Sequence, residues 1–270
     1  MSRIAELFDG LTREGKKGII PFITAGDPNL DVTAELMVEL AHAGAAIIEL
    51  GVPFSDPMAD GPVIQRASER ALQHGFGLDA VLETAARARK RIDTPVVLFS
   101  YYNPLLQFGL ENLVREAKKS GIDGILVTDL TPEEAVPFSA LLHASDIDMI
   151  FLVAPTSTDT RLRMIAEKAS GFIYAVSRTG ITGQRDELSA AAKKLVQRVR
   201  QFSDLPVAVG FGISTKNQVA ETLSYADAAV VGSAIVAEIE RCSGSKDIVN
   251  RVGEYVRSLV PDSFVQASVK

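Results

Sequence analysis

The chain of 270 residues is long enough for one or two domains, and its 47% of hydrophobic residues can form a sizeable buried core. A net charge of −6 argues against a nucleic acid or an anionic membrane as the main partner. The one cysteine, Cys242, cannot form an internal disulfide, and no apolar run suits a secretory signal or a membrane span. We therefore expect a cytoplasmic protein.

Apolar runs and helical patterns alternate along the whole chain. The spacing predicts a helix over 2–14, a strand over 18–28, a helix over 30–43 and a strand over 45–53. A long loop then leads to helical stretches over 62–92. Further strands are predicted over 95–103, 124–130, 148–155, 172–178, 206–212 and 228–234, and further helices over 110–120, 132–145, 159–169, 188–202, 215–224 and 246–259.

The eight predicted strands are nearly continuous apolar runs, as expected when helices cover both faces of a parallel sheet. Strands that alternate with helices in this number favour an α/β fold, a (β/α)8 TIM barrel with an extra N-terminal helix. An open doubly wound sheet is the alternative, but the turn after the first strand, TAGDPN, lacks the G-x-G-x-x-G pattern. No linker divides the chain, so we expect residues 1–270 to form a single TIM-barrel domain.

Long connections follow three of the strands, at 53–62, 103–109 and 178–188. Active sites of such barrels lie at the carboxyl ends of the strands. These loops are therefore expected on the functional face of the barrel.

Two carboxylates are the acid–base candidates. Glu49 interrupts an apolar strand, where an ionised side chain is costly unless it is paired or used in function. A structural carboxylate that accepts backbone hydrogen bonds is the alternative interpretation. Asp60 lies in the loop that follows and would remain ionised, while burial would raise the pKa of Glu49. Asp27 and Asp129 also end strands, and we expect them to cap the following helices.

The end of the chain carries a phosphate-binding pattern. The last two strands end in GFGIS and VGSAIV, at positions where barrels frequently bind phosphate. Gly212, Gly232 and Ser233 would let backbone N–H groups approach the anion, aided by a helix that begins near Ser233. Glycines that merely end strands are the alternative. The loop SRTGITGQR, with Thr182 and Gly183, could close over the ligand.

An apolar pocket would lie beside these groups, because most small-molecule sites combine apolar walls with a few placed polar groups. Tyr101 and Tyr102 fit core positions, and Tyr174 alternates with its neighbours so that it can point into the barrel. The histidines show no metal-ligand spacing, so no metal is expected. The predicted walls of the pocket are Phe22, Phe99, Leu126, Leu152 and Phe211.

The segment ELGVPFSDPMADGP resembles the tryptophan synthase alpha chain family, as do PFITAGDP, YAVSRTGITG, GFGIS and GSAIV, in the same order over essentially the whole length. The resemblance implies a lyase of tryptophan biosynthesis that cleaves indole-3-glycerol phosphate into indole and glyceraldehyde 3-phosphate. It implies no cofactor in this chain. It also implies a partner, the tryptophan synthase beta chain, which uses pyridoxal phosphate and forms an alpha2beta2 heterotetramer with the alpha chain.

The same resemblance implies a role for each matching residue. Glu49 would be the general acid and base, Asp60 would hold the indole N–H, and Tyr174 would help to position Glu49. The substrate ring would contact Phe22, Phe99, Tyr101, Leu126, Leu152, Thr182 and Phe211. The phosphate would be bound by Gly183, Gly212, Gly232 and Ser233, and the beta chain would be contacted by Pro53, Asp56 and Asn103.

Two other functions compete with this interpretation. Indole-3-glycerol phosphate synthase and phosphoribosylanthranilate isomerase are also phosphate-binding barrels, but they are expected to need a strand lysine or a cysteine–aspartate pair. The predicted strands carry no lysine, and Cys242 lies away from them. The other possibility is an interaction subunit without catalysis, against which the presence of both Glu49 and Asp60 argues.

Overall fold

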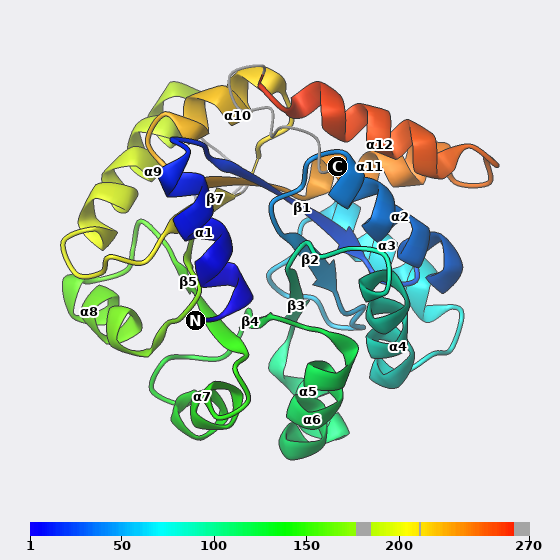
Figure 1. Ribbon diagram of the computed structural model, residues 1–270, viewed down its shortest axis with the longest axis horizontal. Coiled ribbons are helices and arrows are strands. Elements are labelled where there is room, and N and C mark those ends of the chain that lie inside the picture. Colours follow the sequence, from blue (N-terminus) through cyan, green and yellow to red (C-terminus); the bar gives the residue numbers. More distant parts are fainter. Residues whose placement is uncertain (177–184, 211, 262–270) are drawn as a thin grey trace.

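A closed barrel of eight parallel strands forms the centre of the molecule, with the strands in sequence order from β1 to β8 (Figure 1). The computed structural model describes residues 1–176, 185–210 and 212–261. The predicted (β/α)8 TIM barrel is confirmed. The strands are β1 Gly18–Thr24, β2 Ile48–Gly51, β3 Val96–Ser100, β4 Gly124–Val127, β5 Asp148–Val153, β6 Ile173–Val176, β7 Val207–Gly210 and β8 Ala228–Val231.

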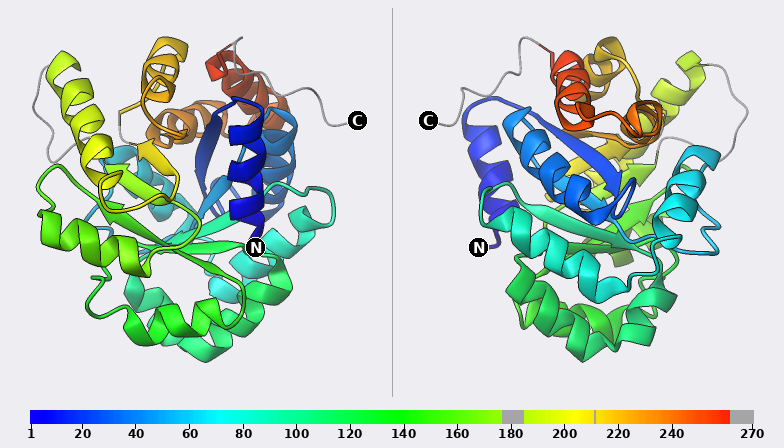
Figure 2. Two further views of the ribbon diagram at one scale, coloured as in Figure 1. Left: turned by 60° about the vertical axis from the view of Figure 1, so that its left-hand side comes forward. Right: turned by 90° about the vertical axis from the view of Figure 1, so that its right-hand side faces the viewer.

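Helices surround the barrel in both views of Figure 2 and follow the strands in the alternation that the sequence predicts. They are α1 Arg3–Arg13, α2 Leu30–His42, α3 Pro62–Leu72, α4 Leu78–Arg89, α5 Tyr102–Phe108, α6 Leu110–Ser120, α7 Val136–His143, α8 Asp159–Lys168, α9 Arg185–Val199, α10 Lys216–Leu223, α11 Ser233–Cys242 and α12 Ile248–Leu259.

Alternate residues of each strand divide the apolar core in two, because successive side chains point to opposite faces of the sheet. Residues such as Ile20, Leu126 and Tyr174 fill the inside of the barrel. Their neighbours, such as Ile23 and Ile125, pack against the ring of helices. The strands are thus buried on both faces, which explains their continuous apolar sequences.

Helix α1 closes the amino-terminal end of the barrel (Figure 1). Its apolar face packs Ile4, Phe8 and Leu11 against the interior cluster. The side chain of Ser2 accepts a hydrogen bond from the backbone N–H of Ala5 and so caps the helix. With this end closed, a substrate can reach the barrel only from the carboxyl ends of the strands.

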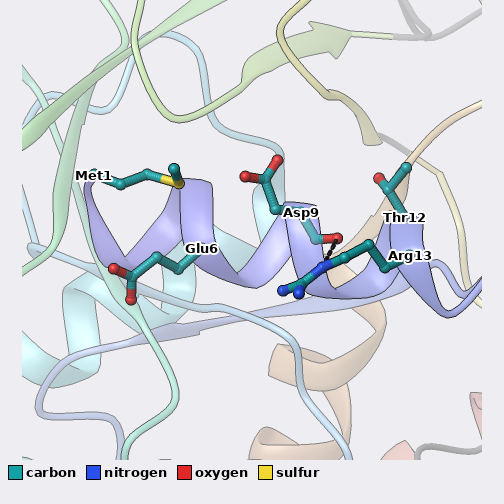
Figure 3. A pocket seen from close by; sticks show the side chains of 5 residues that line it. All are labelled: Met1, Glu6, Asp9, Thr12 and Arg13. Atoms are coloured by element: carbon teal, nitrogen blue, oxygen red, sulfur yellow. Dashed lines mark hydrogen bonds between the residues drawn. The ribbon is translucent and has the colours of Figure 1, made fainter.

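The outer face of α1 has a shallow hollow, shown in Figure 3. Arg13 Nε donates there to the backbone oxygen of Asp9 at 3.3 Å. Because this hollow lies on the side of α1 that faces away from the barrel, it is separate from the carboxyl ends of the strands. Its lining consists of Met1, Glu6, Asp9, Thr12 and Arg13.

Several predicted boundaries were wrong. The connection predicted as a loop over 103–109 contains helix α5, whose seven residues are too few to show helical periodicity. The helical stretches predicted over 62–92 are confirmed as two helices, divided by positive-φ Gly75 and by Gly77 before α4. Helix α9 begins at Arg185 rather than at 188, so the preceding connection ends earlier than expected.

Asp27 and Asp129 do not cap the helices that follow them, so that prediction was wrong. Asn29 caps α2, while Asp27 is buried and accepts two hydrogen bonds of 2.8 Å from the guanidinium of Arg70. Asp129 Oδ1 instead accepts from the backbone N–H of Tyr102 at 2.7 Å, at the start of α5. Both aspartates pair with groups remote in sequence, which local spacing cannot reveal.

Within the described ranges, no helix is both long enough and apolar enough to cross a membrane.

Candidate active site

Glu49 is the second residue of β2 and pairs in register with Phe22 of β1 and Val97 of β3. Its side chain is 1% exposed, and neither carboxyl oxygen has a hydrogen-bond partner. Burial disfavours the charged form and raises the pKa of Glu49 to about 8. The alternative of a structural carboxylate bonded to backbone N–H groups therefore has no support in the described residues. Glu49 is a buried acid that holds its proton at neutral pH.

Asp60 lies in the loop between β2 and α3, beside Tyr101 at the end of β3. The hydroxyl of Tyr101 donates to Asp60 Oδ2 at 3.1 Å and accepts from the backbone N–H of Ala59 at 2.8 Å. Burial raises the pKa of Asp60 to about 6, although the Tyr101 hydrogen bond opposes that rise. Asp60 is therefore mostly ionised at neutral pH, whereas Glu49 is protonated. The site thus contains an acid and an anion that differ because of their surroundings.

Tyr174 of β6 points into the barrel, as its position in the strand suggested. Its pKa lies well above the usual value, chiefly through burial and then through the charges of Glu49 and Asp60. The phenol lies in the interior cluster of the barrel, where the charges of both carboxyl groups act on it. Gly210 of β7 leaves the room that the ring needs, since a Cβ there would lie 2.1 Å from the Tyr174 oxygen.

A Gly210→Ala substitution is expected to displace the Tyr174 ring, because no Cβ can remain 2.1 Å from its oxygen. Overpacking of this kind costs about 1–3 kcal/mol of folding stability. Because the displaced ring lies in the barrel interior with Glu49, we also expect kcat to fall by at least about tenfold, equivalent to about 1.4 kcal/mol of activation free energy. Thermal unfolding and steady-state kinetics measure the two effects. Gly10→Ala in α1, with nothing near its added Cβ, is the matched control and should leave kcat unchanged. Equal kcat in the two variants would contradict the placement of Tyr174.

Apolar side chains form the walls above Glu49. Phe22 and Phe99 meet edge to face, with ring centroids 5.2 Å apart. Phe99 also packs on the interior cluster that holds Leu126, Leu152 and Tyr174. Phe22, Phe99 and Tyr101 line one small cavity with Asp60, whereas Leu126 and Leu152 pack in the interior of the barrel.

The start of α11 faces the same end of the barrel. Gly232 is its N-cap and has no side-chain cap, so backbone N–H groups of the first turn lack a side-chain partner. Ser233 and Gly212 are both exposed, and Gly212 has a φ of +78°, which favours glycine. A helix N-terminus with unpaired N–H groups suits an anion. The three predicted phosphate contacts therefore lie on neighbouring strand ends, after β7 and β8.

Three predicted site residues, Thr182, Gly183 and Phe211, lie outside the described residues. Of the predicted partner contacts, Asp56 and Asn103 are exposed, while Pro53 is buried. The described residues hold no group of three or more metal-ligating side chains that could bind an ion.

Sequence reasoning overlooked Thr24, which lines the small cavity beside Asp60 and Tyr101. The period-two alternation of β1 is the signal that could have found it, because Thr24 lies two residues beyond Phe22 on the same face.

The fold and this geometry define a class: a (β/α)8 barrel with two carboxyl groups of unequal pKa and an uncapped helix N-terminus at the carboxyl ends of its strands. Residues 8–261 match the family model described as tryptophan synthase alpha chain. The alpha chain of Solibacter usitatus is 49% identical over 259 residues, which cover 96% of this chain and 97% of the relative. That of Geobacter sulfurreducens is 48% identical, with 96% and 98% covered.

Solved structures agree with the sequence matches. The alpha subunit from Legionella pneumophila superposes with a TM-score of 0.89 at 39% identity and covers 96% of this chain and 97% of its own. A structure of the tryptophan synthase a2b2 complex from Pyrococcus furiosus matches with a TM-score of 0.83 at 39% identity, covering 90% and 98%. The chain belongs to the tryptophan synthase alpha chain family. It is thus a lyase of tryptophan biosynthesis, and the pyridoxal phosphate of that enzyme belongs to the beta chain.

Proposed function

We propose that the site cleaves indole-3-glycerol phosphate by a retro-aldol reaction in which Glu49 carries the protons. The observation that supports this most is the burial of Glu49 without a partner, which holds a proton on the carboxyl at neutral pH. A barrel acid that stays neutral can donate to a carbon atom, which an ionised surface glutamate cannot do efficiently.

In the first step, Glu49 donates its proton to C3 of the indole ring, and the ring becomes an indolenine cation. The Glu49 carboxylate then removes the proton of the side-chain hydroxyl next to the ring. The C–C bond breaks, its electrons return to the ring, and indole and glyceraldehyde 3-phosphate leave. Glu49 ends the cycle protonated, so the reaction requires no cofactor in this chain.

Asp60 stabilises the cation, because an ionised carboxylate near the ring nitrogen favours positive charge there. The Tyr101 hydroxyl fixes one Asp60 oxygen, and Tyr174 positions Glu49. We assign the ring contacts to Phe22, Phe99, Leu126, Leu152, Thr182 and Phe211. We assign the phosphate contacts to Gly183, Gly212, Gly232 and Ser233.

Replacement of Asp60 tests this assignment. Asp60→Asn preserves the shape of the side chain but removes the charge that stabilises the cation. We expect kcat/KM for indole release to fall about 10²-fold or more, in the range found when one transition-state contact is lost. The acidic limb near pH 6 should also disappear, since no carboxyl titrates at that position. Asp9→Asn, at an exposed aspartate of α1 remote from the site, is the control. Unchanged turnover in Asp60→Asn would remove Asp60 from the mechanism.

We infer that the beta chain binds over the carboxyl ends of the strands, in an alpha2beta2 complex like that named for the Pyrococcus furiosus structure. Two large apolar side chains are exposed on this face: Met58, 89% exposed, and Leu106 of α5, 52% exposed. Asp56 and Asn103 are exposed beside them. Pro53 is buried, so we assign it a supporting place beneath the contact.

We further propose that residues 1–270 form one domain and that the protein works in the cytoplasm, where a single unpaired cysteine stays reduced. An alpha chain that only activates its partner is the competing function. Indole release by the isolated chain and by its mixture with a beta chain separates the two, since absence of indole in both assays would favour the interaction subunit.

A further inference from the structure

Thr24, the last residue of β1, has an unsatisfied hydroxyl. Its side chain is 2% exposed, and Oγ1 has no hydrogen-bond partner. Among the described residues, the only other buried side-chain oxygens without a partner are the two of Glu49. Buried hydroxyls are normally bonded, and a valine of the same shape would avoid the cost. An unsatisfied hydroxyl on the wall of a cavity that Asp60 also lines therefore points to a partner that is present only while the enzyme works.

The cavity that Thr24 lines identifies that partner. It is partly open, has a volume of about 10 Å³ and is also lined by Asp60, Tyr101, Ser68 and Ser100. The Ser100 hydroxyl already donates to the Tyr101 backbone oxygen at 2.9 Å. Asp60 is the one carboxyl group on the wall of this cavity, and a hydroxyl can donate to a carboxylate.

The described hydrogen bonds of the Asp60 carboxyl group involve one oxygen, Oδ2, which accepts from Tyr101. In the proposed mechanism the Asp60 carboxylate accepts from the ring N–H and stabilises the positive charge of the ring. A second hydrogen-bond donor would lower the pKa of this carboxyl group and fix its orientation. Thr24 can be that donor, since it reaches the cavity from β1 while Tyr101 reaches it from the end of β3. Two strands would then hold the carboxylate from two sides.

We propose that Thr24 is a positioning residue whose hydroxyl donates a hydrogen bond to the Asp60 carboxylate once substrate occupies the site. This inference rests on the proposed role of Asp60. In the free enzyme the two groups are not bonded, so Thr24 acts only in the bound state. Its effect is therefore on kcat, whereas the ionisation of the free enzyme is unaffected.

The pH profile separates this role from a merely structural one. The acidic limb of kcat/KM reports the free enzyme, and the limb of kcat reports the enzyme with bound substrate. The titratable groups that face Asp60 are Tyr101, bonded to it, and Tyr174 and Glu49 nearby. Both tyrosines have raised pKa values, and burial places the pKa of Glu49 near 8, so Asp60 is the one of these groups that titrates near pH 6.

Thr24→Val is the direct test, because it preserves shape and removes the hydroxyl. We expect the acidic limb of kcat to move up by about one pH unit, with kcat reduced about tenfold at pH values well below that limb, while the limb of kcat/KM stays in place. Thr24→Ser retains a donor and should keep the wild-type limb of kcat. The matched control is Thr84→Val in α4, where the buried hydroxyl donates to the Ala80 backbone oxygen at 2.8 Å, outside the site.

The outcomes are distinct. If Thr24→Val retains the wild-type limb of kcat, or if both limbs move together, the inference is overturned. If Thr24→Val does not fold, Thr24→Ala gives the same comparison, since it too lacks the hydroxyl. Failure of the wild-type enzyme to release indole, or full activity of Asp60→Asn, would instead overturn the proposed function on which the inference rests.

Discussion

Glu49→Gln is expected to lower kcat for the release of indole from indole-3-glycerol phosphate by at least about 10²- to 10⁴-fold, the usual contribution of a general acid or base. The loss should reach the upper part of that range, because one side chain both donates to C3 and accepts from the hydroxyl. Glutamine has nearly the same shape, so substrate affinity should change little. Steady-state kinetics and a direct binding measurement on the same preparation distinguish the two quantities.

A surface glutamate provides the control for this substitution. Glu167→Gln on the exposed side of α8 makes the same chemical change away from the site and should leave kcat unaltered. Near-normal turnover in Glu49→Gln would show that the buried acid is not the proton carrier. A large rise in KM with unchanged kcat would show that Glu49 only binds substrate.

Glu49 should also make the free energy of unfolding depend on pH, and the direction of this dependence follows from the raised pKa of Glu49. The ordinary pKa of a glutamate is 4.5, and burial raises that of Glu49 to about 8 in the folded state. Between these values the folded state retains a proton that the unfolded state releases. The free energy of unfolding of the wild type therefore falls by about 1.4 kcal/mol per pH unit as pH rises through this interval, on the order of 5 kcal/mol in all.

Glu49→Gln has no proton to lose, so its stability should lack this decline. Denaturant unfolding of both proteins at about pH 4 and about pH 9 isolates the contribution of Glu49, because every other titrating group is shared. We expect the free energy of unfolding of the variant to increase relative to that of the wild type as pH rises. A constant difference between the two proteins would mean that Glu49 is ionised in the folded state and has a partner.

Periodicity and polarity predicted much of this molecule, because these features are local in sequence. The strands follow from apolar runs buried on both faces, and α1 follows from the spacing of Ile4, Phe8 and Leu11. The burial of Glu49 was predicted from its apolar neighbours in β2. Helix α5 was missed, since a helix of seven residues with one buried position, Leu105, presents no repeat.

Pairings between distant residues could not be predicted in this way. Asp27 looked like a helix cap, but its partner is Arg70, which is 43 residues away in sequence. The bond between Tyr101 and Asp60 likewise joins the end of one strand to the loop after another. Local spacing contains no information about which loops meet when the barrel closes. Local spacing also could not identify Thr24 as a candidate, because the argument for Thr24 depends on its hydroxyl lacking a hydrogen-bond partner in the folded protein.

Arg70 shows how such pairings support the site. Its guanidinium joins Asp27, in the loop after β1, to Glu240 of α11 at 2.7 Å. The loop after β1, helix α3 and helix α11 are thereby tied together around Phe22. Helix α3, which follows Asp60, and helix α11, which begins at Ser233, are thus held in a fixed relation.

A structure of Glu49→Gln with bound indole-3-glycerol phosphate tests the central assignment most directly. We predict residue 49 against ring C3, an Asp60 oxygen within hydrogen-bond distance of the ring N–H, and the phosphate at the first turn of α11. A ring nitrogen that faces away from Asp60, or a phosphate bound elsewhere, would contradict the assignment.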